Sequence, residues 1–193
     1  MRRSITSLAL LVVGLAVTST LNGQLIDKDH GLWIAAGVGG ASIDVDCPSR
    51  CPSSRKVGFA GFFQIGGVPS SRVPVGVEFD GWRRDDSSAQ REYFLVSAFF
   101  DFYPVEHGPL FLHFGAGAGR YAQETPGEDF SATGFGFQFG GGYEISLSRH
   151  LVAAPFARFL FALGQNSKVN RFSIESDLDF NMLQLGGQIR WFP

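Results

Sequence analysis

Cysteine, a common nucleophile and metal ligand, occurs only twice in this sequence. Two cysteines, Cys47 and Cys51, have three residues between them in the stretch CPSRCP. Two ligands alone make a poor zinc site, and the redox motif of thiol oxidoreductases has two intervening residues, not three. We therefore expect a disulfide that closes a small loop in an oxidising compartment, with free or metal-bound thiols as the alternative. No cofactor and no metal site is predicted.

A glycine-rich stretch, GAGAGR at 115–120, is a candidate for binding phosphate. Phosphate-binding glycine loops lead into a helix whose N-terminus receives the phosphate, and no helical pattern follows this one. We interpret these glycines instead as closely packed positions on one face of a strand. The titratable residues are more numerous, and their role depends on the elements that carry them.

The stretch TGFGFQFGGGYEIS, from Thr133 to Ser146, shows what those elements are. Three phenylalanines occupy its odd-numbered positions, whereas glycines, Gln138 and Glu144 occupy its even-numbered positions. A period of two places these two sets on opposite faces of a β-strand. An apolar face backed by a small, polar face is typical of a transmembrane β-barrel strand.

The same alternation recurs along the chain and predicts an all-β fold, an eight-stranded antiparallel up-and-down transmembrane β-barrel. Each segment is long enough for the roughly 9–11 residues that a tilted membrane strand needs. The predicted strands are 32–43, 57–67, 73–83, 92–103, 110–121, 133–146, 151–163 and 178–192.

The connections between these segments alternate in length. Short turns are expected at 68–72, 104–109 and 147–150. Longer, more polar loops are expected at 44–56, 84–91, 122–132 and 164–177. Outer-membrane barrels have short periplasmic turns and longer extracellular loops, so this pattern places both termini in the periplasm.

Alternation also predicts which polar side chains point into the barrel. Buried charges need partners, and an eight-stranded barrel is just wide enough for side chains to fill it. We expect Glu78 to meet Arg158 near mid-height, and Arg190 to meet Glu144 and Asp101 near the periplasmic end. A salt-bridged plug is the favoured interpretation, and a proton or ion path is the alternative. The predicted inward set is Gln64, Glu78, Asp80, Asp101, His113, Gln138, Glu144, Arg158, Gln184, Gln188 and Arg190.

All tryptophans and tyrosines fall within a few residues of a predicted strand end, where interfacial girdles of membrane barrels lie. By strict alternation only Tyr143 and Trp191 face lipid, and bulges at the rims would be needed to turn the others outward. The seven residues are Trp33, Trp82, Tyr93, Tyr103, Tyr121, Tyr143 and Trp191.

The N-terminus has the pattern of an export signal. Arg2 and Arg3 precede an apolar run from Leu8 to Val17 that is too short to span a membrane as a helix. We expect a signal peptide over 1–23 and a single barrel domain over 24–193. The formal net charge of −2 gives no basic field, so nucleic acid is not an expected partner.

With its closing segment QLGGQIRWF, this architecture resembles the small eight-stranded outer-membrane barrels of the OmpA/OmpX type from about Leu32 to Phe192. The resemblance implies a monomer in the outer membrane, in contact with its lipids and lipopolysaccharide. It also implies insertion by the barrel-assembly machinery, which reads a terminal aromatic residue. Here Phe192 is followed by Pro193, a departure from that pattern.

The expected function is non-catalytic, either structural or a surface interaction through four extracellular loops. Lipid-modifying enzymes of similar size use a histidine near the outer leaflet, whereas His30, His107, His113 and His150 all fall at the periplasmic end of the predicted barrel. The charged loop tips are interpreted as solvated surface. As a hypothesis, Arg83, Arg84 and Arg91 bind a host surface, a phage or a lipopolysaccharide phosphate.

Two other readings remain open from sequence alone. An exported soluble barrel of the lipocalin type would turn its phenylalanine face inward around an apolar ligand, but its water-exposed face would then be unusually rich in glycine. A narrow pore is a further alternative, although eight strands leave little room for one.

Overall fold

The alternating segments pair side by side into one closed sheet. The computed structural model describes residues 31–46, 55–86, 89–106, 108–125, 128–169 and 172–193. No helix in these ranges is long and apolar enough to cross a membrane. Their strands are β1 (Leu32–Asp46), β2 (Lys56–Gly67), β3 (Val75–Asp86), β4 (Ala89–Phe102), β5 (Leu110–Thr125), β6 (Glu128–Tyr143), β7 (Ile145–Ser146), β8 (Leu151–Val169) and β9 (Phe172–Trp191).

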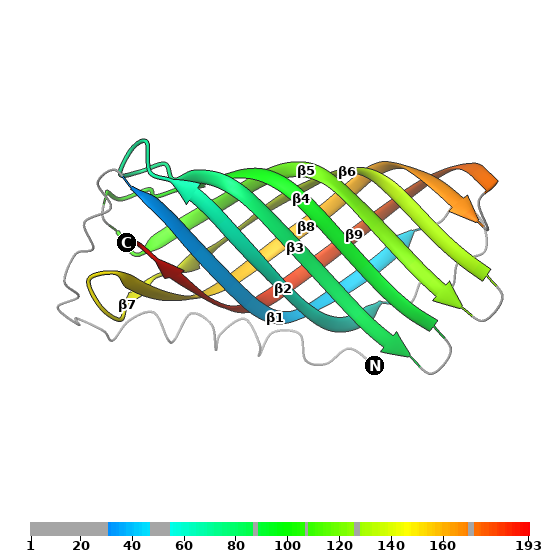
Figure 1. Cartoon of the computed structure of the whole chain (residues 1–193), viewed down its shortest axis with the longest axis horizontal. Helices are drawn as coiled ribbons and strands as arrows, with labels where there is room; N and C mark the ends of the chain where they lie inside the picture. The colour runs from blue at the N-terminus through cyan, green and yellow to red at the C-terminus, as the bar shows by residue number, and fades with distance from the viewer. Residues whose placement is uncertain (1–30, 47–54, 87–88, 107, 126–127, 170–171) are drawn as a thin grey trace, which may run out of the picture.

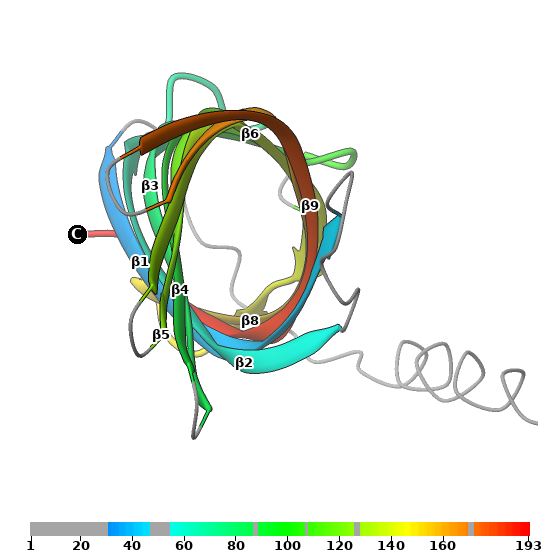
Figure 2. The ribbon, with the colours of Figure 1, turned by 90° about the vertical axis from the view of Figure 1, so that its right-hand side faces the viewer.

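Eight of these strands make the wall of the barrel. Neighbours in sequence pair antiparallel from β1 to β6, β6 pairs with β8, and β9 pairs with both β8 and β1. Figure 1 shows the strands tilted relative to the long axis of the barrel, and Figure 2 shows them arranged as a ring. The predicted eight-stranded antiparallel barrel is confirmed.

The short strand β7 continues β6 after a break caused by Pro155. Gly142 of β6 pairs with Phe156 of β8, and Ile145 of β7 pairs with Ala153 of β8, so both pairs share one register. In that register Tyr143 faces Pro155, which has no amide hydrogen to donate to the ladder. One predicted strand, 133–146, is therefore divided in two at this point.

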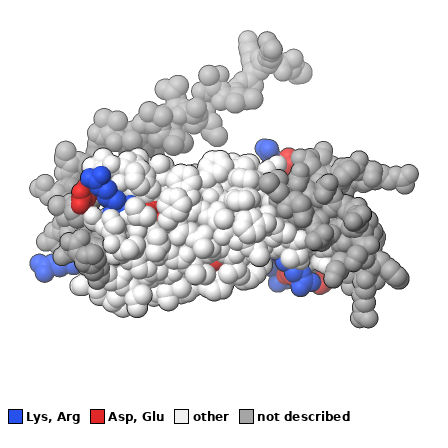
Figure 3. Space-filling view, turned by 90° about the horizontal axis from the view of Figure 1, so that it is seen from above, with Lys and Arg blue, Asp and Glu red and all other residues white. Residues whose placement is uncertain are grey.

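The outer surface of the barrel is an apolar belt. Figure 3 shows lysine, arginine and acidic atoms gathered toward the two ends of the visible face and few between them. Because the phenylalanines of β6 face outward, the lipocalin-like alternative is wrong. Large apolar side chains exposed on the belt include Val38, Phe59, Phe63, Ile65, Val77, Phe79, Phe94, Val96, Phe100, Phe114, Phe135, Phe137, Phe139, Leu185, Ile189 and Trp191.

The inner surface is packed in layers. An aromatic and aliphatic layer fills the extracellular half, where Trp82, Tyr93 and Phe180 are buried together. Smaller apolar clusters around Trp33 and Tyr103 lie toward the end that holds the short turns, which we call the periplasmic end. The polar side chains of the interior lie between and beside these layers.

The strands run further at the extracellular end than predicted. The segments 84–91, 122–132 and 164–177 were expected to be loops, but most of their residues continue the ladders of adjacent strands. Arg84 of β3 still pairs with Arg91 of β4, for example. The loop prediction was wrong here because it relied on the polarity of the side chains. Strand pairing uses backbone N–H and C=O groups, which charged residues also supply.

Several sequence predictions lie outside the described residues. These are the signal peptide over 1–23, the disulfide between Cys47 and Cys51, and the placement of His30 and His107. They remain predictions, as does the start of the barrel domain at residue 24.

Candidate functional site: the polar interior

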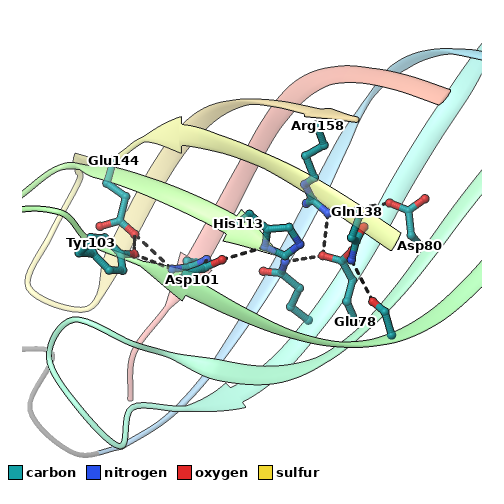
Figure 4. Close-up of polar contacts among 11 residues, drawn as sticks. Glu78, Asp80, Asp101, Tyr103, His113, Gln138, Glu144 and Arg158 are labelled. Atoms are coloured by element: carbon teal, nitrogen blue, oxygen red, sulfur yellow. Dashed lines mark hydrogen bonds and ion pairs between the residues drawn. The ribbon is translucent and has the colours of Figure 1, made fainter. Parts of the chain in front are cut away.

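The most concentrated set of polar side chains lies inside the barrel, at mid-height, around Glu78 of β3. The Glu78 carboxylate accepts hydrogen bonds from the amides of Gln64 on β2 and Gln138 on β6, the latter at 2.8 Å. Nη1 of Arg158, on β8, donates to the same carboxylate at 2.7 Å. Gln138 also donates to the Ser97 hydroxyl on β4 at 2.9 Å. Figure 4 shows this convergence of side chains.

Arg158 is held by aromatic rings as well as by the carboxylate. Its guanidinium carbon lies 3.7 Å from the centre of the Phe62 ring and 4.7 Å from that of Phe156. The Asp80 carboxylate is buried nearby, 4.0 Å from Nη1 of Arg158. Ring faces attract a cation that has lost its water, so two rings and two carboxylates together offset the cost of burying Arg158.

A second polar cluster surrounds Arg190 of β9, nearer the periplasmic end. Arg190 donates through Nη2 to Asp101 at 2.5 Å, and through Nη1 to the Tyr103 hydroxyl at 2.8 Å and to Glu144 at 3.3 Å. Tyr103 in turn donates to Glu144 at 2.5 Å. Nδ1 of His113 lies 2.8 Å from the second oxygen of Asp101.

Every polar residue predicted to face inward is buried in the structure. Glu78 meets Arg158, and Arg190 meets Asp101 and Glu144, which are the two groupings expected from alternation. Asp80 lies beside the first grouping, 4.0 Å from Arg158, and takes no part in the hydrogen bonds to Glu78. The buried set is Gln64, Glu78, Asp80, Asp101, His113, Gln138, Glu144, Arg158, Gln184, Gln188 and Arg190.

Acidic groups outnumber arginines in the interior. Four carboxylates, those of Glu78, Asp80, Asp101 and Glu144, face the two guanidinium groups of Arg158 and Arg190. Among the described residues no group of three or more His, Cys, Asp or Glu side chains is arranged to hold a metal ion. The arrangement is suited to bracing the wall from within.

Sequence reasoning missed two members of these clusters. Tyr103 bridges Arg190 and Glu144, and Ser97 accepts from Gln138. Ser97 lies on β4 and Tyr103 directly follows it, and both have the same odd-numbered parity as Asp101. Strict alternation therefore places both side chains inside the barrel. Tyr103 was considered only for its nearness to a strand end and was not included in the inward polar set.

That girdle is confined to two residues. Tyr143 and Trp191 are exposed on the outer surface, as alternation predicted. The other five point inward, because no bulge turns them outward and their rings fill the lumen. They are Trp33, Trp82, Tyr93, Tyr103 and Tyr121.

The arginines of the β3–β4 hairpin are paired with nearby acids. Arg84 and Arg91 lie on the inner face of the extracellular mouth and both contact Asp86, at 2.8 Å and 2.6 Å. Arg83 faces outward and contacts Asp85 at 3.2 Å. Strand parity therefore separates Arg83 from the other two, and the hypothesis that the three bind a host surface, a phage or a lipopolysaccharide phosphate stays a prediction.

Comparison with known proteins gives the fold. No protein-family model matches the sequence, and no curated protein matches it. Among solved structures, Neisserial surface protein A aligns over 83% of this chain and 96% of its own, with 16% identity and a TM-score of 0.54. Ail of Yersinia pestis aligns over 83% and 99%, with 18% identity and a TM-score of 0.54. OprG of Pseudomonas aeruginosa aligns over 85% and 98%, with 9% identity and a TM-score of 0.53.

Proposed function

With the fold of the small outer-membrane β-barrels as the starting point, we propose that this protein is a non-catalytic barrel of the outer membrane that strengthens the bilayer and presents its extracellular strand ends. The observation that carries the proposal is the pairing of an apolar outer belt with a filled, ion-paired interior. The belt suits lipid as the surrounding solvent. The filled interior suits a rigid wall better than a conduit.

A closed interior argues against the pore alternative. The Arg158 and Arg190 clusters lie at two heights in the barrel. A buried apolar layer around Trp82 fills the extracellular half, and another around Trp33 lies toward the periplasmic end. A passing ion would have to displace a buried guanidinium from its carboxylate, which is costly in a low-dielectric environment. Steady conduction is therefore not part of the proposal.

The positions of the described histidines support the absence of catalysis. His113 is buried beside Asp101, and His150 lies in a periplasmic turn with its Nδ1 3.0 Å from the carbonyl oxygen of Phe192. Chemistry on outer-leaflet lipids would need a base at the opposite end of the barrel. The described part of the chain holds no histidine there.

A polyanion-binding surface is less well supported. Ail was solved in complex with a heparin analogue, sucrose octasulfate. Here the arginines of the β3–β4 hairpin contact Asp85 and Asp86, so a polyanion would have to compete with carboxylates on the same hairpin. The proposed surroundings are outer-membrane lipids and lipopolysaccharide, the proposed state is a monomer, and the barrel-assembly machinery is the proposed insertion partner.

The test is to express the full chain, separate the membranes and compare its mobility on SDS gels with and without boiling. We expect recovery in the outer membrane and a mobility shift on boiling. The purified barrel should then give no steady current in planar bilayers. Recovery in the soluble periplasm without a shift would contradict the membrane assignment, and a steady current would contradict the closed interior.

A further inference from the structure

One arginine stands apart from the charge pairs described above. Arg120 lies on β5 at an outward-facing position and is exposed. The outward positions below it on the same strand are apolar, from Leu110 to Ala118. Unlike the arginines of the β3–β4 hairpin, Arg120 has no hydrogen bond or ion pair with another of the described residues.

The position of Arg120 along β5 sets its depth. It lies ten residues beyond Leu110, the first residue of the strand. At about 3.4 Å per residue and a tilt of about 40°, this separation corresponds to roughly 26 Å along the membrane normal. The apolar band of such barrels is about 25 Å tall. Arg120 therefore lies at the upper edge of the belt, where lipid tails give way to headgroups.

The neighbours of Arg120 make a partly apolar, partly hydrogen-bonding setting. Phe94 of β4 is its cross-strand partner on one side and Thr133 of β6 on the other. Phe94 and the nearby Phe135 are about half exposed, and the Thr133 side chain is exposed. Cross-strand side chains on one face lie about 5 Å apart, so the Thr133 hydroxyl is in reach of an anion held by Arg120.

The outward-facing acids of these strands lie further from the membrane. Glu92 of β4 pairs across the ladder with Arg83 on one side and Ala122 on the other. Glu124 is two outward positions beyond Arg120 on β5. Neither carboxylate lies opposite Arg120 in the register, and neither forms an ion pair with its guanidinium among the described residues.

We infer that Arg120, with Thr133 beside it, binds a phosphate group of a lipopolysaccharide molecule in the outer leaflet. A guanidinium on the lipid-facing surface is unfavourable unless it reaches water or an anion. The phosphates of lipid headgroups lie at the depth of Arg120, and guanidinium groups recognise phosphate oxygens through paired donors. The apolar rings of Phe94 and Phe135 would contact the first carbons of the acyl chains.

The choice of lipopolysaccharide follows from the end of the barrel at which Arg120 lies. The periplasmic end carries the short turns, so Arg120 belongs to the extracellular boundary. Lipopolysaccharide is the phosphorylated lipid of that leaflet, whereas phospholipids occupy the other. This step rests on the proposed outer-membrane location.

The test uses the full-length, folded barrel in nanodiscs, with folding of each variant verified by the mobility shift on boiling. Binding of bis-phosphorylated lipid A, dephosphorylated lipid A and phosphatidylglycerol would be measured for the wild type and for Arg120→Gln, Arg120→Lys and Arg149→Gln. Arg149 is the matched control, since it is an exposed arginine in a periplasmic turn.

We expect Arg120→Gln to bind lipid A about tenfold more weakly than the wild type, Arg120→Lys to fall between them, and Arg149→Gln to bind as the wild type does. Wild-type protein should bind dephosphorylated lipid A about as weakly as Arg120→Gln binds lipid A, a comparison that needs no variant to fold. Equal binding by Arg120→Gln and the wild type would overturn the inference. Equal affinity of the wild type for phosphatidylglycerol would overturn the choice of lipid. A barrel that folds but is recovered outside the outer membrane would contradict the proposed function separately.

Discussion

At the scale of single residues, the interior is organised around two buried arginines. Arg158 is surrounded by a carboxylate at 2.7 Å and two aromatic rings, and Arg190 by two carboxylates and the Tyr103 hydroxyl. In both cases one cation joins strands that are far apart in the sequence. A buried ion pair costs desolvation and contributes little net stability, but removal of one partner is severe. The clusters therefore link opposite sides of the barrel wall across the lumen.

Glu78→Gln tests that dependence. The substitution keeps the size and much of the hydrogen bonding but leaves Arg158 with only Asp80, 4.0 Å away, as a nearby charge. We expect the free energy of unfolding to fall by about 3 kcal/mol, because a buried cation loses its main counter-ion. Urea unfolding in lipid vesicles, followed by the boiling-dependent mobility shift, would measure it.

Asp85→Asn is the matched control for Glu78→Gln. The Arg83–Asp85 pair is more than half exposed on both sides, and exposed pairs contribute little because water screens them. The control should unfold almost as the wild type does. Equal effects of the two substitutions would mean that the interior cluster is hydrated and its charges are screened.

Much of this cluster could be predicted from sequence, and the reason is parity. Once β3 is a membrane strand, Glu78 and Asp80 must share the inner face with Gln64 and Arg158 on other strands. Parity does not say how far a side chain reaches, so the link from Tyr103 to Arg190 was missed. Alternation alone predicted that only Tyr143 and Trp191 face lipid, as the structure shows, whereas nearness to a strand end would have placed all seven tryptophans and tyrosines in a girdle.

At the scale of elements, glycines set how closely neighbouring strands pack on the inner face. A Cβ atom added to Gly117 of β5 would overlap the carbonyl oxygen of Val96 and the Cα atom of Ser97 on β4. Both are backbone atoms, so they cannot move aside without disturbing the ladder. Close contact with β4 thus requires glycine at position 117, whereas at Gly115 and Gly119 an added Cβ would meet the side chains of Gln138 and Tyr93.

Gly117→Ala should therefore destabilise the barrel by at least 1 kcal/mol, since the strand must shift to admit one methyl group. The measurement is the urea midpoint of folded protein in vesicles. Gly187→Ala on β9 is the control, because an added Cβ there meets no atom within 4 Å. A loss for Gly187→Ala as large as that for Gly117→Ala would show that glycine content, and not contact, determines the effect.

Element lengths were the part of the fold least predictable from sequence. Apolar alternation marks a strand only where one face meets lipid, and it fades where both faces meet water. The hairpin from β3 to β4 continues to Asp86 and Ala89, although its tip is charged. Backbone hydrogen bonds extend this hairpin, and they do not require any particular pattern of side chains.

At the scale of the whole molecule, the outer belt determines where the barrel is stable. Phe137 lies near the middle of β6 on the lipid-facing side, stacked on Phe161 with ring centres 5.3 Å apart. Phe137→Arg should lower the free energy of unfolding of the barrel in vesicles by about 3 kcal/mol, whereas Leu110→Arg, at the edge of the belt, should lower it by less than about 1 kcal/mol. The two values would be measured by urea titration in the same lipid. Equal costs would contradict a lipid-facing belt of this height.

Closure of the barrel depends on its last strand. β9 pairs with β8 along one edge and with β1 along the other, so its loss would expose the unpaired backbone groups of two strands. Lipid cannot satisfy those groups. A chain truncated after Val169, the last residue of β8, should therefore fail to show the boiling-dependent shift and fail to insert into vesicles.

Deletion of Pro193 alone is the control for that truncation. Pro193 lies beyond the end of β9, and the amide of Phe192 donates to the His150 carbonyl oxygen at 2.8 Å without involving Pro193. The deletion leaves both ladders of β9 intact and places an aromatic residue at the C-terminus. We expect the same shift as in the wild type, measured on the same gels, together with equal or faster assembly in cells. A truncated chain that still shifted on boiling would mean that seven strands can close without β9, against the pairing of β9 with β1.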